Sequence, residues 1–205
     1  MPIEDERRTA RINAIRRRDA DRLEASLGRL PDPVKRSRLV VLTGLPGSGK
    51  SHFARALAKR YPAAILDSDA LREVLFENPQ HTAKEHGRLF PAMHVLMDRL
   101  LERGIAVIVD ATNLKDENRR PYYEIADRRG AEVLLVRIWA PARTIRARLS
   151  HRTASPDPAD RSSANMDVYE AMLKETERIR RPHVSVDTSG DLGPALDKVL
   201  GLLQS

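Results

Sequence analysis

The chain has 205 residues, of which 41% are hydrophobic and 32% are charged, and its formal net charge is +7. This length supports one well-buried domain with a small appendage. The sequence contains no cysteine, so disulfides, thiolate catalysis and cysteine-ligated zinc are excluded. No stretch approaches the roughly 18 apolar residues that a membrane span needs, and the charged segment 1–22 lacks the apolar centre of a secretory signal. We therefore expect a cytoplasmic protein with no membrane partner.

The positive charge favours polyanionic partners such as nucleotides, phosphorylated substrates or nucleic acid. A composition rich in arginine and alanine also arises from a GC-rich genome, so the charge alone leaves both explanations open. Aromatic residues make up only 4% of the chain. This scarcity argues against an extended platform on which bases stack.

Residues 1–30 are expected to form one helix. Apolar residues recur at helical spacing within it, and basic residues fill its other faces. The apolar positions are Ile12, Ile15, Leu23, Leu27 and Leu30. Asp19 interrupts this stripe, so the apolar face is narrow. Two roles remain open for the helix: a basic arm that contacts nucleic acid, or a helix that packs on the flank of the domain or on a second subunit.

Pro31 and Pro33 end the helical pattern and lead into the first strand. We therefore divide the chain into a basic N-terminal helix with a proline-containing linker, residues 1–37, and a main domain, residues 38–205.

From residue 39 onwards, apolar runs alternate with helical patterns. The runs expected as strands are 39–43, 63–66, 105–110, 131–139 and 183–188. The expected helices are 50–60, 70–78, 89–104, 116–130, 141–152, 166–181 and 193–203, with a polar connection at 79–88. Continuous apolar strands that alternate with helices indicate an α/β fold, with a parallel sheet covered on both faces.

The segment GLPGSGKS, residues 44–51, follows the first strand and precedes a helix. It matches the pattern G-x-x-x-x-G-K-[ST], in which backbone N–H groups and the amino end of a helix cradle nucleotide phosphates. Its three glycines can adopt φ values that are closed to other residues, so that these N–H groups converge on phosphate oxygens. Lys50 is expected to reach the β- and γ-phosphates of ATP, and Ser51 to hold Mg²⁺. The predicted nucleotide-binding residues are Gly44, Leu45, Pro46, Gly47, Ser48, Gly49, Lys50 and Ser51.

Three classes of nucleotide-binding protein are disfavoured. The chain has neither an Asn-Lys-x-Asp tetrapeptide to read guanine nor the Leu-Ser-Gly-Gly-Gln stretch of transporter ATPases. It is also too short for the helical lid and sensor elements of a ring-forming motor. A small chain with a phosphate loop and a late arginine-rich segment fits a phosphotransferase better.

The second strand leads into LDSDALR, which brings Asp67 and Asp69 to the carboxyl edge of the sheet, where ligands bind in open α/β folds. Asp69 can accept the proton of an attacking hydroxyl, and Arg72 can clamp an anionic or polar part of the acceptor from the same helical face. We therefore predict that Asp69 is catalytic and that Asp67 and Arg72 bind substrate. The alternative is that Ser68 or Asp69 only caps the helix and that Arg72 is solvated.

The third strand leads into VIVDATNL. Asp110 follows four apolar residues, the pattern of a carboxylate that supports magnesium from a neighbouring strand. We predict a magnesium site at Ser51 and Asp110, and substrate contacts from Asp110, Thr112 and Asn113. A structural role for Asp110, as a cap or as the partner of a basic residue, is the alternative.

A late segment carries Arg146, Arg148 and Arg152, which are expected to project from a helix end into a polar connection. Such a lid, over about 146–165, can close over the nucleotide, exclude water and present an arginine to the transferring phosphoryl group. The alternative is a solvated basic face. Three histidines are interpreted as incidental rather than as a metal site: His81, His86 and His94.

Four segments, in this order and spacing, resemble the polynucleotide 5′-hydroxyl kinase family: GLPGSGKS, DSDALR, VIVDATNL and the arginine-bearing lid. They are also similar to other small kinases of the AAA-type P-loop kinase superfamily, the zeta-toxin-like and gluconate-kinase-like groups. The resemblance covers about residues 38–190. It implies a P-loop NTPase fold of nucleotide-kinase type, with five parallel strands in the order 2-3-1-4-5 between helices.

The resemblance also implies roles for individual residues. Lys50 and Ser51 would serve ATP and magnesium, Asp69 would be the general base, and Arg72 would contact the phosphate next to the acceptor hydroxyl.

The lid arginines have a counterpart in the same family. Arg152, four residues after Arg148, would match the family's lid arginine. Both are expected to bind the nucleotide, and Arg152 to act in catalysis together with Lys50 and Asp69.

We therefore expect an ATP- and Mg²⁺-dependent kinase that moves the γ-phosphate to a hydroxyl, with the 5′-OH of a DNA or RNA end as acceptor. A kinase that acts on a small hydroxylated molecule, such as a sugar, nucleoside or antibiotic, is the first alternative. A nucleotide-dependent binding module or regulatory ATPase is the second, from a different class.

Overall fold

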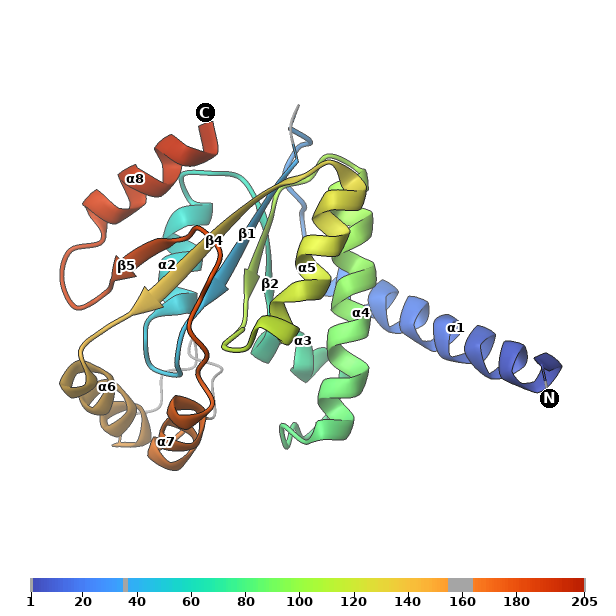
Figure 1. Cartoon of the computed structure of the whole chain (residues 1–205), viewed down its shortest axis with the longest axis horizontal. Coiled ribbons are helices and arrows are strands. Elements are labelled where there is room, and N and C mark those ends of the chain that lie inside the picture. Colours follow the sequence, from blue (N-terminus) through green and yellow to red (C-terminus); the bar gives the residue numbers. More distant parts are fainter. Residues whose placement is uncertain (1, 35–36, 155–163, 205) are drawn as a thin grey trace.

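The computed structural model describes residues 2–34, 37–154 and 164–204. Five parallel strands form one sheet in the order β2-β3-β1-β4-β5, with helices on both faces (Figure 1). The strands are β1 (Arg38–Thr43), β2 (Ala64–Asp67), β3 (Val107–Asp110), β4 (Glu132–Trp139) and β5 (Val184–Asp187). This topology confirms the expected fold class and strand order.

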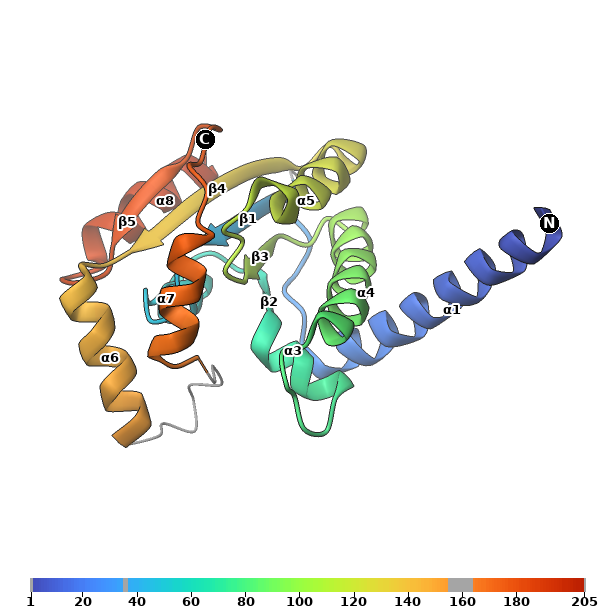
Figure 2. The same cartoon turned by 60° about the horizontal axis from the view of Figure 1, so that its bottom comes forward.

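The helices form two layers on the sheet and a group at its carboxyl edge. The helices are α1 (Pro2–Ser26), α2 (Lys50–Ala58), α3 (Ser68–Leu75), α4 (Ala83–Glu102), α5 (Asp116–Arg129), α6 (Ala142–Ala154), α7 (Met166–Lys174) and α8 (Gly193–Gln204). α2 and α8 cover one face of the sheet, and α4 and α5 cover the other. α6 and α7 pack together beyond the carboxyl end of β4 (Figure 2). In the described ranges, no helix combines the length and apolarity needed to cross a bilayer.

β1 is apolar along most of its length because both of its faces are covered. Leu39 and Val41 lie in the core on one side of the sheet, whereas Val40 and Leu42 lie in the core on the other. β1 is also the central strand, since it hydrogen-bonds to β3 on one side and β4 on the other. The loop that follows β1 therefore starts in the middle of the carboxyl edge.

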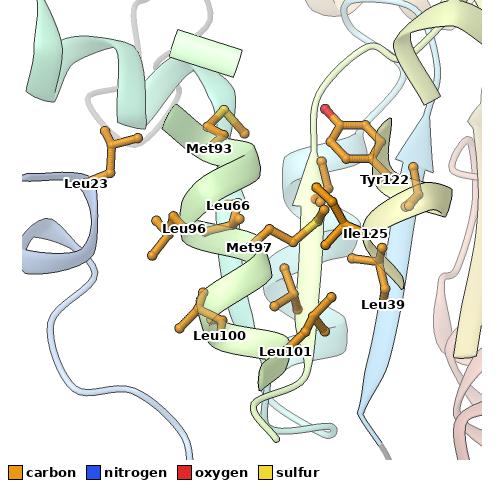
Figure 3. Packing of buried hydrophobic residues seen from close by; sticks show 14 of the residues in the cluster. Leu23, Leu39, Leu66, Met93, Leu96, Met97, Leu100, Leu101, Tyr122 and Ile125 are labelled. Carbon is orange, nitrogen blue, oxygen red and sulfur yellow. The ribbon is translucent and has the colours of Figure 1, made fainter. Parts of the chain in front are cut away.

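The larger core lies between α4 and the sheet (Figure 3). Met93, Leu96, Met97 and Leu100 of α4 are at most 1% exposed and share this core with Leu66 of β2. Burying one such side chain contributes about 1.5–3 kcal/mol to folding. α4 is therefore a principal anchor for the β2–β3 half of the sheet.

α4 begins at Ala83, earlier than the predicted residue 89. Residues 82–85, TAKE, form a helix start that the prediction placed in a connection. The backbone N–H of Glu85 donates to the Thr82 hydroxyl over 3.3 Å, the first half of a capping box. α7, by contrast, is shorter than predicted and ends at Lys174 rather than near 181.

α1 is half packed and half exposed. Ala20 and Leu23 are fully buried in the larger core, whereas residues 4–18 are exposed along a helix that projects from the body (Figure 1). Ile12 and Ile15, which belong to the predicted apolar stripe, are 40% and 47% exposed. The flank-packing role therefore describes only the C-terminal half of this helix.

Asp19 fixes the packed half to α4. Its carboxylate is 2% exposed and accepts two hydrogen bonds from the Arg88 guanidinium, both of 2.7 Å. Such a bidentate pair is geometrically specific. The residue that interrupts the apolar stripe is thus an anchor of the helix.

We expect Arg88→Gln to destabilise the protein more than Asp19→Asn. Loss of Arg88 leaves a buried carboxylate without its cation, which costs about 3 kcal/mol, whereas loss of the Asp19 charge leaves an arginine that is already 42% exposed and costs about 1 kcal/mol. Urea unfolding of the two variants measures the difference. Equal losses would contradict this asymmetry.

Candidate active site

The phosphate loop connects β1 to the amino end of α2, and two of its glycines have left-handed backbone conformations. The φ angles are 75° at Gly47 and 89° at Gly49. Gly49 is the N-cap of α2 and supplies no side-chain cap, so no side chain occupies the helix end. The first N–H groups of a helix have no partner within the helix, so this end of α2 can bind an anion.

Gly44 is required for a reason that differs from the prediction. It does not belong to the residues with positive φ. Instead, a Cβ at this position would lie 2.3 Å from the Ile138 backbone oxygen and 2.8 Å from the Ser48 hydroxyl. Glycine is needed because the start of the loop touches the backbone of β4.

The far side of the loop is tied to α6 and to the end of β5. Arg148 donates to the backbone oxygen of Gly47 over 3.2 Å and to that of Thr188 over 2.6 Å. The Thr188 hydroxyl in turn donates to the Ser48 oxygen over 2.6 Å. Thr188 was missed by the prediction; its only sequence signal is its place at the end of the predicted strand 183–188.

Arg148 thus lies within α6 and contacts the loop backbone, rather than projecting into a connection as predicted. It also lines the central cavity, and its contact with the nucleotide remains a prediction. The side chain of Arg152 and residues 155–163 of the predicted lid lie outside the described part of the structure.

Lys50 and Ser51 face the carboxylate at the end of β3. The Lys50 ammonium donates to the Leu45 oxygen over 3.1 Å. Asp110 is 3% exposed, and its Oδ2 atom has no hydrogen-bond partner. Burial raises the pKa of Asp110 to about 6, while Lys50 and a hydrogen bond with Ser51 oppose the rise.

Ser51 and Asp110 fit the requirements of Mg²⁺. Magnesium is usually held by one or two carboxylates together with substrate phosphates and water. The buried, unpartnered Oδ2 of Asp110 beside a serine hydroxyl supplies the protein share of such a set. Within the described ranges, no group of three or more histidine or acidic residues forms a fuller metal cage.

Asp67 is the N-cap of α3, and this corrects the alternative that Ser68 or Asp69 caps the helix. Its Oδ1 atom accepts hydrogen bonds from the backbone of Asp69, at 2.9 Å, and of Ala70, at 3.2 Å. Because Asp67 takes this role, the Asp69 carboxylate in the first turn is not used as the cap. Both carboxylates line the central cavity.

Asp69 has the electrostatic surroundings of a base. Burial raises the pKa of its carboxyl group, the Asp67 charge adds to the rise, and His81, Lys50 and Arg72 oppose it. A higher pKa makes a carboxylate a better proton acceptor.

Arg72 is not solvated. It is 2% exposed, and its guanidinium donates to Glu85 over 3.2 Å. Glu85 also accepts the backbone N–H groups of Gln80 and His81, both at 2.9 Å, and these bonds lower its pKa although its burial acts in the opposite sense. The Nε atom of Arg72 has no partner, and the residue lines the central cavity.

Thr112 and Asn113 shape the start of the phosphate loop. The Thr112 oxygen accepts the Gly44 N–H over 3.0 Å, and the Asn113 amide donates to the Leu42 oxygen over 2.8 Å. Asn113 has a φ of 47°, which asparagine tolerates better than most residues. These structural roles do not test the contacts of Thr112 and Asn113 with substrate, which remain predictions.

These groups surround one cavity of about 1650 Å³ at the carboxyl edge of the sheet. This volume exceeds the range of about 300–1,000 Å³ typical of single-ligand pockets, so the cavity has room for two substrates. His81, His86 and His94 also line it, although the prediction treated them as incidental. Their sequence spacing did not mark them, because only the folded chain brings α4, which carries His86 and His94, and the loop with His81 to this cavity.

We expect Gly44→Ala to abolish nucleotide binding, because the added methyl group meets the Ile138 backbone and displaces the loop. Calorimetric titration with an ATP analogue measures the loss. Gly87→Ala, where an added Cβ has no atom within 4 Å, is the control. Full binding by the Gly44 variant would contradict the close-packing argument.

We expect His94 to make stability fall as the solution is acidified. Burial, with a smaller contribution from Arg16, lowers the pKa of His94 from 6.5 to about 4. Between these values the unfolded chain binds a proton that the folded chain does not, so the free energy of unfolding falls by up to about 3 kcal/mol as the pH decreases. Urea unfolding of His94→Gln across this window should show a flatter dependence than the parent protein; parallel curves would refute the assignment.

Comparison with known proteins gives matches across most of the main domain. The family model described as AAA domain (AAA_33) matches residues 39–179. The L-seryl-tRNA(Sec) kinase of Methanococcus maripaludis is 31% identical over 105 residues, which are 50% of this chain and 41% of that protein. The chain thus spans less than half of this curated relative.

Two solved structures share the fold. The APS kinase CysC of Mycobacterium tuberculosis, in complex with AMPPNP and APS, has a TM-score of 0.65 and 20% identity over 83% of this chain and 99% of its own. Kti12 of Chaetomium thermophilum, in complex with ADP-AlF3, has a TM-score of 0.64 and 20% identity over 81% of this chain and 97% of its own. Since the AAA_33 match covers more than half of the residues, the chain belongs to this family of P-loop kinase-like proteins.

Proposed function

We propose that the protein is an ATP- and Mg²⁺-dependent phosphotransferase that moves the γ-phosphate of ATP to a hydroxyl group. The observation that carries the proposal is that one cavity is lined by the phosphate-loop residues Lys50 and Ser51 and by the carboxylates Asp69 and Asp110. A phosphate site and a base with a raised pKa, side by side, are what phosphoryl transfer to an alcohol requires.

In the proposed reaction the acceptor hydroxyl loses its proton to Asp69. Its oxygen forms a bond to the γ-phosphorus, while the bond between that phosphorus and the β–γ bridging oxygen breaks and ADP leaves. Lys50 and the N–H groups of the loop stabilise the charge that spreads over the phosphate oxygens. Mg²⁺ held by Ser51 and Asp110 would neutralise part of the same charge when bound.

Arg72 is proposed to hold the acceptor. Glu85 keeps the guanidinium of Arg72 oriented. The unpartnered Nε of Arg72 is then a donor for an anionic group of the acceptor. Arginine suits this role because its planar donors match phosphate oxygens. A phosphate next to the reacting hydroxyl is therefore the preferred partner.

For the acceptor we propose the 5′-OH of a DNA or RNA end. A basic chain of net charge +7 and a buried arginine beside the base support a phosphate-bearing acceptor. The relative described as an L-seryl-tRNA(Sec) kinase supports a second nucleic-acid acceptor, a hydroxyl carried by tRNA. A small phosphate-bearing alcohol is the remaining candidate, favoured by the fold shared with an APS kinase.

A phosphate-transfer assay with ATP labelled at the γ position decides between these acceptors. The protein is offered oligonucleotides with a free 5′-OH, serylated tRNA, and a panel of sugars and nucleosides. Labelled oligonucleotide is the expected product. Label only in tRNA or in a small molecule would replace the proposed acceptor, and labelled phosphate released without any acceptor would favour a regulatory ATPase.

We expect Asp69→Asn to lower the rate of transfer by about 10²–10⁴-fold, the usual contribution of a general base. Binding of ATP should be nearly unchanged, because Asp69 contacts the acceptor rather than the phosphate loop. Glu73→Gln, on the exposed face of α3, removes the same charge and is the matched control. Transfer by Asp69→Asn at the parental rate would contradict the assignment of the base.

A further inference from the structure

A second cavity of about 460 Å³ lies between α1 and α4. Its walls are Asn13, Arg16 and Arg17 of α1 and Pro91, His94 and Val95 of α4. His94 lines the central cavity as well. α4 thus has one side on each cavity, and His94 stands at the boundary between them.

The second cavity is positively charged. Arg16 and Arg17 line it and no acidic residue does. In the described ranges, neither guanidinium has a carboxylate or a hydrogen-bond partner, whereas Arg88 and Arg99 of α4 are paired with Asp19 and Asp21 of α1. Arg88 and Arg99 of α4, and Arg103 directly after it, thus pair with carboxylates of α1, whereas Arg16 and Arg17 of α1 line this cavity.

The same charge continues along the projecting half of α1. Residues 7–18 contain six arginines and no acidic residue, and all six are exposed: Arg7, Arg8, Arg11, Arg16, Arg17 and Arg18. Along the helix axis this segment measures about 16 Å, at 1.5 Å per residue. Because an α-helix turns by about 100° per residue, these arginines surround the helix axis, and Arg16 and Arg17 are the two that line the cavity.

We propose that the second cavity, with Arg16 and Arg17, is the docking site for the sugar–phosphate backbone of a nucleic-acid acceptor. This inference rests on the proposed function. The reacting end of the strand occupies the central cavity beside Asp69, and Arg16 and Arg17 contact phosphates further along the strand.

A second copy of the chain is the competing occupant. Ile12 and Ile15 are exposed on the same helix and offer some apolar surface. Parallel packing of two α1 helices would bring like arginines together, and juxtaposed like charges oppose binding. Antiparallel packing would place the exposed Glu4, Asp5 and Glu6 against arginines, but the second cavity itself is lined by Arg16 and Arg17 and by no acidic residue. Charge complementarity therefore favours a polyanion.

The test is the binding of a short fluorescein-labelled single-stranded oligonucleotide with a free 5′-OH, followed by fluorescence anisotropy across a salt series. The probe reports docking whether or not phosphate is transferred. In Arg16→Gln/Arg17→Gln we expect weaker binding and a salt slope smaller by about 1.4, because each phosphate neutralised on a single strand contributes about 0.7.

The matched control is Lys59→Gln/Lys198→Gln. It removes two exposed positive charges near α2 and on α8, on the opposite layer of the sheet, and neither residue lines a cavity. The control should bind the probe like the parent protein. In the transfer assay, the arginine variant should show a higher KM for the oligonucleotide with kcat and the KM for ATP unchanged, a split that general destabilisation would not produce.

Equal binding by the parent protein and the arginine variant would overturn the docking site, as would failure of the parent protein to bind the probe. Binding without transfer would refute the proposed acceptor while leaving the docking result intact. Sedimentation decides the competing occupant: a dimer that dissociates in Ile12→Ser/Ile15→Ser, with unchanged probe affinity, would assign α1 to self-association and overturn the proposal.

Discussion

The confinement of the phosphate loop between strand ends is the constraint on which the site depends. The loop starts against the backbone of Ile138 and accepts support from residues that follow β3 and β5, through Thr112 and Thr188. A loop held from both sides has one conformation, so its N–H groups and the amino end of α2 are oriented before a nucleotide binds. Such preorganisation avoids the cost of reorienting dipoles during the reaction.

The same confinement sets the electrostatics of the cavity. β2 and β3 end beside the loop, which brings Asp69 and Asp110 close to Lys50. Burial raises the pKa of both carboxyl groups, and the charge of Asp67 adds to both rises. Asp69 lies in the first turn of α3, where Asp67 rather than Asp69 caps the helix. Asp110 ends a buried strand beside Ser51. Neighbouring carboxylates thus acquire different surroundings, and different chemistry follows from their positions.

The positive charge of the chain is distributed unevenly. In the body, arginines near α4 and α5 are held by carboxylates, as in the pairs of Arg129 with Asp98 and Arg88 with Asp19. These pairs use charge to orient helices. On the projecting half of α1 the arginines lack such partners in the described ranges, and two of them, Arg16 and Arg17, line the second cavity. The net charge of the chain therefore indicates a function only when the arginines paired with carboxylates are considered separately from those without such partners.

Local patterns sufficed for the fold class, the phosphate loop and most element positions, because a helix period, a buried strand or a loop motif is set by residues close together in the chain. The start of α4 was also encoded locally, in the cap at Thr82, and was overlooked. Other features depended on contacts between distant segments: the reason for Gly44, the pairing of Arg72 with Glu85, the role of Thr188 and the gathering of the histidines. The sequence by itself therefore determined which chemical groups the protein carries and on which elements they lie. Only the packing of those elements decided which groups meet, because side-chain contacts across a sheet edge are set by tertiary distance and not by spacing along the chain.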